Sequence, residues 1–274
     1  MPLIELELEK DPSSPLYRWY RARDRAALGR LEDARVELRS VLGLDGSARE
    51  DAAKYGRTPF LGAISTFVQV VSDLGAEVDH ENDLDVLLAE VPDHPALLLA
   101  KARAHASRRQ PREAAQLALE AHAVLPEAKP EWGALRVAAI TWQATELAAQ
   151  QLMEAADYPA ALQAYQACIS ARPDEQPGWS PILTNAAAIS IELGQPQTTE
   201  VLLGRLLGRP ECHPGMFYFE LDRRLRTSGL EAAQRLWQLA AGASHLHGQP
   251  EYEAWKARLG FTAETPPAAS AEPQ

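Results

Sequence analysis

The stretch MEAADYPAALQAYQACISARP, residues 153–173, carries the small Ala161, then the larger Tyr165 and Cys168, and ends at Pro173. Intervals of four and three residues place these side chains on one face of a helix. Two neighbouring stretches, LLAEVPDHPALLL at 87–99 and EAHAVLPEAKPEW at 120–132, also end alike. Their prolines at 92 and 126 lie 34 residues apart. A repeat of that length is typical of chains that stack helix pairs.

Placing Pro92 and Pro126 at repeat position 32 suggests six units, although three of the five steps between their starts are longer than 34 residues. The units begin at Pro15, Leu61, Pro95, Trp142, Ser180 and Pro214. Helices that approach closely need small side chains, and eight of the twelve residues at positions 8 and 20 are alanine. These twelve are Ala22, Val68, Ala102, Ala149, Ala187 and Leu221 at position 8, and Ala34, His80, Ala114, Ala161, Thr199 and Ala233 at position 20. Gly29, Gly75 and Gly194 stand at position 15, where glycine suits the end of a helix.

With Tyr158, Ala161, Tyr165 and Pro173 at the signature places, residues 15–247 resemble the tetratricopeptide repeat (TPR) family. The resemblance implies an all-α fold, a right-handed superhelical solenoid of antiparallel helix pairs. We expect an N-terminal arm at 1–14, a helical-repeat domain at 15–260 with about six helix pairs, and a disordered tail at 261–274. A capping helix should lie at 251–259. An irregular helical bundle and another type of helix-pair solenoid remain alternatives.

Three segments lie outside the regular repeat. Leucine or isoleucine alternates with glutamate over residues 4–9, which predicts a short strand or an extended arm. Residues 47–60 form an insertion between the first two units. A helix is expected from Glu131 to Ala156, beginning before its own repeat does.

Composition excludes several classes of function. The net charge of −11 argues against nucleic acid or an anionic membrane as the main partner. No window has the ~18 apolar residues that a membrane helix needs, and the N-terminus lacks the basic region of a secretory signal. Two cysteines, Cys168 and Cys212, are too few for a disulfide framework and suit a reducing compartment. We therefore expect a cytoplasmic protein.

Two groups of residues have the chemistry of metal ligands. Asp79, Glu81, Asp83, Asp85 and Glu90 match positions 1, 3, 5, 7 and 12 of a calcium loop. Leu84 replaces the glycine that this loop needs, so we favour a helix start whose dipole attracts the carboxylates. Cys212, His213, His245 and His247 could bind zinc, but their spacing matches no standard finger. We expect no metal and no cofactor.

Signatures of catalysis are absent from the sequence, which has no nucleophile elbow, dinucleotide fingerprint, phosphate loop or zinc-protease motif. We therefore expect no enzyme activity. The segment from Leu16 to Arg30 contains five arginines interleaved with acidic residues. It could contact a nucleic-acid backbone or an acidic protein, although a solvated face with salt bridges is the favoured interpretation.

The family resemblance implies that first-helix residues line a concave surface that receives a protein or peptide. These candidate partner-binding residues are Trp19, Tyr20, Arg23, Gln69, Arg103, Glu146, Gln150, Asn185, Tyr218 and Asp222, and Thr66 and Phe219 belong to the same lining. For Trp19 and Tyr218, core packing between helices is an equal alternative. On the second helices, Arg172 is expected to be exposed, and Arg35 and Arg39 to take no part in binding. The expected function is a non-catalytic interaction scaffold; the alternative is a regulatory or sensor module that binds a small ligand or controls a transcription factor.

Overall fold

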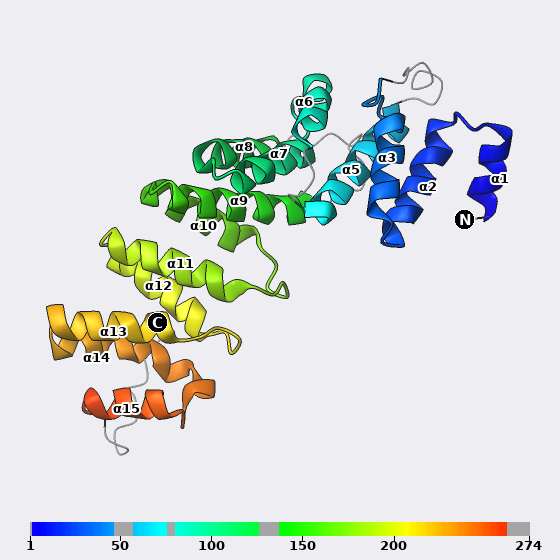
Figure 1. Ribbon diagram of the computed structural model, residues 1–274. Coiled ribbons are helices and arrows are strands. Elements are labelled where there is room, and N and C mark those ends of the chain that lie inside the picture. Colours follow the sequence, from blue (N-terminus) through cyan, green and yellow to red (C-terminus); the bar gives the residue numbers. More distant parts are fainter. Residues whose placement is uncertain (1, 47–56, 76–79, 126–136, 262–274) are drawn as a thin grey trace, which may run out of the picture. The chain divides into compact units, whose positions relative to one another are not determined.

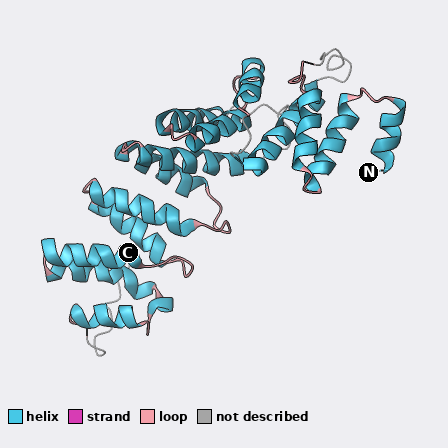
Figure 2. Ribbon diagram, in the orientation of Figure 1, coloured by secondary structure: helices cyan, strands magenta, loops and turns pink. Residues whose placement is uncertain are grey.

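The computed structural model describes residues 2–46, 57–75, 80–125 and 137–261. Within those ranges every regular element is helical and no residue lies in a strand (Figure 2). The chain divides into two compact units, the first made of Met1–Ala160 with Ser170–Arg172 and the second of Ala161–Ile169 with Pro173–Gln274. The all-α prediction is therefore confirmed for the described part of the chain.

The first unit contains α1 to α9 (Figure 1). Their bounds are α1 Pro2–Lys10, α2 Pro15–Ala27, α3 Leu31–Val41, α5 Arg57–Leu74, α6 Glu81–Glu90, α7 Pro95–Ser107, α8 Pro111–Val124 and α9 Val137–Glu154. Helices α2 and α3 pack together, as do α7 and α8, and α5 contacts α2, α3 and α7. Helix α9 packs on α8 and also contacts α7. The first helices of successive repeats are thus neighbours within this unit.

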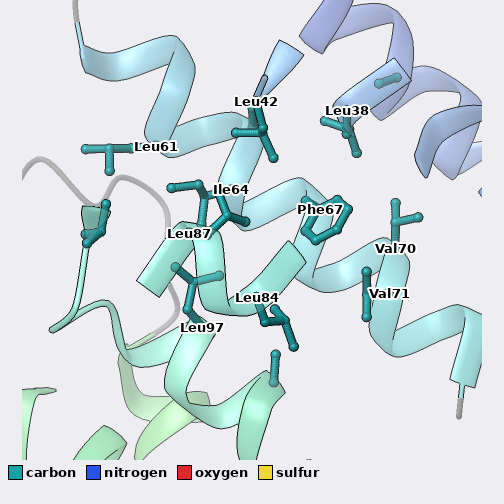
Figure 3. Packing of buried hydrophobic residues seen from close by; sticks show 14 of the residues in the cluster. Leu38, Leu42, Leu61, Ile64, Phe67, Val70, Val71, Leu84, Leu87 and Leu97 are labelled. Atoms are coloured by element: carbon teal, nitrogen blue, oxygen red, sulfur yellow. The ribbon is translucent and has the colours of Figure 1, made fainter. Parts of the chain in front are cut away.

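A hydrophobic core joins α3, α5, α6 and α7 in the first unit. Phe67 lies at its centre, fully buried between Leu38 of α3 and Leu84 of α6 (Figure 3). Leu97 brings α7 into the same cluster. Because α6 contributes Leu84 and Leu87 to this core, the acidic segment around them is held as a packed helix.

The second unit contains most of α10 and the helices that follow. Their bounds are α10 Tyr158–Ala171, α11 Trp179–Glu192, α12 Pro196–Leu207, α13 Gly215–Thr227, α14 Leu230–Trp237 and α15 Pro250–Arg258. Helix α11 packs on α12, and α13 packs on α14. Tyr252 of α15 lies 4.7 Å from Trp237 between ring centroids, so aromatic contacts attach the predicted capping helix to this unit.

The repeat register agrees with the pattern of burial. Of the twelve residues at positions 8 and 20, only Val68 is not fully buried. His80, Thr199 and Leu221, which replace alanine at these positions, are also buried, each 6% exposed or less. Small side chains at these positions allow two helix backbones to approach closely, which accounts for their abundance in this chain.

The turn at position 15 recurs in five of the six units. Gly29, Gly75 and Gly194 adopt positive φ values of 76°, 76° and 64°, as expected for glycine after a helix. Arg109 and Ala156 adopt 59° and 60° at the same repeat position without being glycine. In four of these turns the N–H at position 15 donates to the carbonyl at position 12, and the next N–H donates to position 11. This shared hydrogen-bond pattern supports one repeated helix–turn–helix unit.

Of the expectations about segments outside the repeat, the one for residues 4–9 needs correction. Residues 4–9 form neither a strand nor an extended arm but lie within α1, which packs on α2. Leucine and glutamate are both good helix formers, and that preference outweighs the alternation of the pattern. Helix α9 is described from Val137, five residues before its repeat begins at Trp142. Residues 131–136 of the expected helix, 47–56 of the insertion and 262–274 of the expected tail lie outside the described residues.

Ala102 offers a direct test of the register. It lies at position 8 of α7, is fully buried, and has fully buried Ala114 as its partner position on α8. Replacing Ala102 with leucine should overpack this contact and lower the free energy of unfolding by about 1–3 kcal/mol in urea melts. Ala254 is exposed on α15, so the same substitution there should change stability by less than about 0.5 kcal/mol. Equal effects of the two substitutions would show that the register is wrong.

Candidate partner-binding surface

Trp19 bridges α2 and α5 rather than standing free in solvent. Its Nε1 donates to Thr66 Oγ1 at 2.9 Å. A Cβ placed on Gly62 would come within 2.3 Å of the indole ring, so only glycine at this position lets the ring lie against α5. The core-packing alternative therefore describes Trp19 better than the role of a free anchor.

Tyr20 and Arg23 continue outward from Trp19. The rings of Trp19 and Tyr20 stack with centroids 5.0 Å apart. The Arg23 guanidinium lies 5.0 Å from the centroid of the Tyr20 ring, a cation–π distance. Its nearest ion-pair partner, Asp24, is 3.9 Å away, and the Arg23 side chain is 57% exposed. The Arg23 cation therefore lies against stacked aromatic rings and has only a distant carboxylate partner.

Arg103 connects the first helices of three successive repeats. From α7, its Nη1 donates to Ser72 Oγ on α5 at 3.2 Å and its Nη2 to Gln143 Oε1 on α9 at 3.1 Å. Arg103 is exposed, and the neighbouring helices desolvate its guanidinium enough to lower the pKa of that group. Among the described residues, Arg103 has no carboxylate within ion-pair distance. It remains a cation held in place by two neutral groups.

Gln69 and Gln150 complete the polar part of this surface. Gln69 is exposed on α5, where its Nε2 donates to Asp73 Oδ1 at 2.8 Å. Gln150 is half-buried on α9. Together with Tyr20, Arg23 and Arg103, these two residues keep polar groups accessible on the first helices of the first unit.

Glu146 is occupied by an internal ion pair. Arg172 Nη1 lies 3.0 Å from Glu146 Oε2, and the guanidinium stacks on Trp142 at 4.2 Å from its centroid. Arg172 is only 8% exposed, so the expectation that it would be exposed is wrong. An aromatic face and a carboxylate together stabilise a buried arginine, which charge alone does not reveal.

In the second unit, the three candidate residues serve internal contacts. Asn185 Nδ2 donates to Tyr165 Oη at 3.1 Å. Asp222 forms ion pairs with Arg226 at 2.6 Å and with Arg258 at 3.1 Å, and the second pair joins α13 to α15. Tyr218 is 4% exposed and stacks on Trp255 at 6.4 Å. Internal contacts thus account for these three side chains, and the burial of Tyr218 favours its core-packing alternative.

Tyr218 and Phe219, both expected in the lining, differ in burial. Burial raises the pKa of the Tyr218 hydroxyl to about 12, and that hydroxyl has no hydrogen-bond partner within the described structure. The adjacent Phe219 is 58% exposed on α13. Because neighbouring residues on a helix point in directions about 100° apart, a small rotation of the helix decides which aromatic side chain is exposed.

The arginine-rich helix α2 forms the expected salt bridges, but around a buried carboxylate rather than on a solvated face. Arg18, Arg21 and Arg25 converge on Glu37 of α3, which is 4% exposed. Arg35 pairs with Glu32 on its own helix. Arg39 contacts Asp83 of α6 at 3.0 Å, an ion pair that joins α3 to α6.

The two candidate metal groups do not assemble in the described residues. Asp83, Asp85 and Glu90 lie along α6, and a continuous helix cannot fold into a calcium loop. Asp79 lies outside the described residues. No cluster of three histidine, cysteine or acidic residues suited to a metal ion occurs in the ranges that the structure covers. Within the same ranges, no helix combines the length and apolarity needed to span a bilayer.

The surface that remains therefore combines Tyr20, Arg23, Gln69, Arg103 and Gln150 on the first helices of the first unit. Trp19 supports it from beneath. The arrangement offers an aromatic ring, two cations and amide groups, which are side chains suited to contacts with a partner. Comparisons of this chain with family models, curated proteins and solved structures find no match.

Proposed function

We propose that this protein is a non-catalytic interaction scaffold of the tetratricopeptide repeat type. In this proposal its six helix pairs form a right-handed solenoid, and the first helices bind a segment of a partner protein. Support comes from the recurring turn at position 15, the buried residues at positions 8 and 20, and the contacts among α2, α5, α7 and α9. The two buried free thiols, Cys168 and Cys212, favour a reducing compartment such as the cytoplasm.

Arg103 is the observation that carries this proposal. Arg103 is an exposed cation whose guanidinium donates only to two neutral groups, so its charge is not neutralised among the described residues. A carboxylate from a partner could accept charge-assisted hydrogen bonds from this guanidinium. Tyr20 would add apolar contact area, and Arg23 a second charge, on the same series of helices.

The experiment begins with the partner, identified by affinity purification of the full chain from its native cell. Replacing Arg103 with alanine should then weaken binding by about 1–3 kcal/mol, or roughly 5- to 150-fold in the dissociation constant, because a charge-assisted contact with the partner is lost. Isothermal titration calorimetry measures the loss, and a thermal melt checks the fold.

Arg205 provides the matched control. It is exposed on α12, a second helix, and its replacement with alanine should leave the affinity within about twofold. A partner that binds the Arg103 variant as tightly as the unaltered chain would refute the proposed surface.

A further inference from the structure

The first unit also has a groove whose lining lies apart from the residues around Arg103. An open groove of about 520 Å³ runs along α8 and the C-terminal end of α9. Its lining residues are Arg112, Ala115, Gln116, Leu119, Glu120 and Ala123 of α8, with Leu152, Ala155 and Asp157 at the end of α9. None of these residues belongs to the surface around Arg103.

Alanine and leucine side chains provide the apolar part of the groove lining. Ala115 is buried at its base, and Leu119 is 40% exposed near the middle of α8. Alanines at 115, 123 and 155 leave room for another backbone to approach, as in the closely packed helix pairs elsewhere in the chain. From Arg112 to Ala123 the groove follows α8 for ~16 Å, or three helical turns.

Charged groups along the groove are available to a partner. Within the described residues, Arg112 takes part in no ion pair, and Glu120 only accepts a hydrogen bond from Gln116 at 3.0 Å. Asp157 is used differently, since it accepts a hydrogen bond from the Ala160 N–H at the start of α10. Arg112 and Glu120 therefore present opposite charges, separated by ~12 Å along α8.

We propose that this groove binds an amphipathic helix of a partner protein. Its apolar face, spaced at i, i+3, i+4 and i+7, would pack over Leu119 and the alanines. An acidic residue would face Arg112, and a basic residue about two turns away would face Glu120, which fixes the direction of the bound helix. The site is independent of the partner surface around Arg103.

A peptide display library of helices about 14 residues long, selected against the full-length chain, tests this proposal. Enriched peptides should carry the apolar spacing with an acidic and a basic residue at opposite ends. Their affinity should fall at least ~10-fold for Leu119→Lys, which places a charge in the groove. It should stay within about twofold for Arg103→Ala, and this control separates the groove from the proposed functional surface.

Reversal of the charges gives the decisive result. A selected peptide should bind Arg112→Glu at least ~10-fold more weakly, and changing its acidic residue to lysine should restore the affinity. Thermal melts confirm that each variant is folded. The proposal is overturned if no selected peptide binds more tightly than ~100 µM, or if Leu119→Lys leaves the affinities unchanged. It is equally overturned if this substitution only abolishes self-association in analytical ultracentrifugation, because the occupant is then a second copy of the chain.

Discussion

Replacing Glu37 with alanine should lower the free energy of unfolding by about 2–4 kcal/mol. The Glu37 carboxylate is almost fully buried and accepts from Arg21 Nε at 2.9 and 3.0 Å and from Arg25 Nη1 at 2.8 Å, with Arg18 Nε at 3.6 Å. These hydrogen bonds raise the pKa of Arg21. Without the carboxylate, three neighbouring arginines would repel one another on α2. Their side chains are about a quarter exposed, which keeps the expected loss below that of a fully buried pair.

Urea unfolding at neutral pH measures this effect, and Glu32 on the same helix provides the control. Glu32 pairs with Arg35 across one turn, but its side chain is 56% exposed. Replacing Glu32 with alanine should therefore cost less than about 1 kcal/mol. If Glu37 and Glu32 prove equally dispensable, the arginine cluster contributes little to joining α2 to α3.

The repeat register could be predicted from sequence because close contacts between helices restrict side-chain size. Alanine at positions 8 and 20 and glycine at position 15 are direct consequences of sterics. Arg109 and Ala156 show where such a prediction ends. Their backbones adopt the same left-handed conformation as the glycines, and nothing in the identity of either residue signals it.

The candidate surface was harder to predict because it depends on contacts between repeats. Arg103 and Tyr20 could be selected from their repeat positions alone. The stacking of Arg172 on Trp142 depends on residues 30 positions apart, which the repeat pattern does not relate. The burial of Tyr218 likewise depends on Trp255 of the capping helix, so only the folded second unit distinguishes it from Phe219.

Acidification from pH 6.5 toward pH 4 should destabilise the protein through His94. This residue precedes α7, and its side chain is fully buried. Burial lowers the pKa of the imidazole from 6.5 to about 4, although the nearby Asp93 opposes the shift. The unfolded chain therefore binds a proton in this pH range while the folded chain does not. Stability is fully present above pH 6.5 and is lost as the pH falls.

The expected loss is about 3 kcal/mol, at ~1.4 kcal/mol for each pH unit between the two pKa values. That is a large part of the 5–15 kcal/mol typical of folded domains. Urea unfolding at several pH values between 4.5 and 7 measures it. Other carboxylates titrate in the lower part of this range, so His94→Asn, which keeps a favoured residue before a helix, serves as the reference. As the pH falls, the unaltered chain should lose about 2 kcal/mol or more of unfolding free energy relative to His94→Asn. Parallel pH profiles would show that protonation of His94 does not govern acid stability.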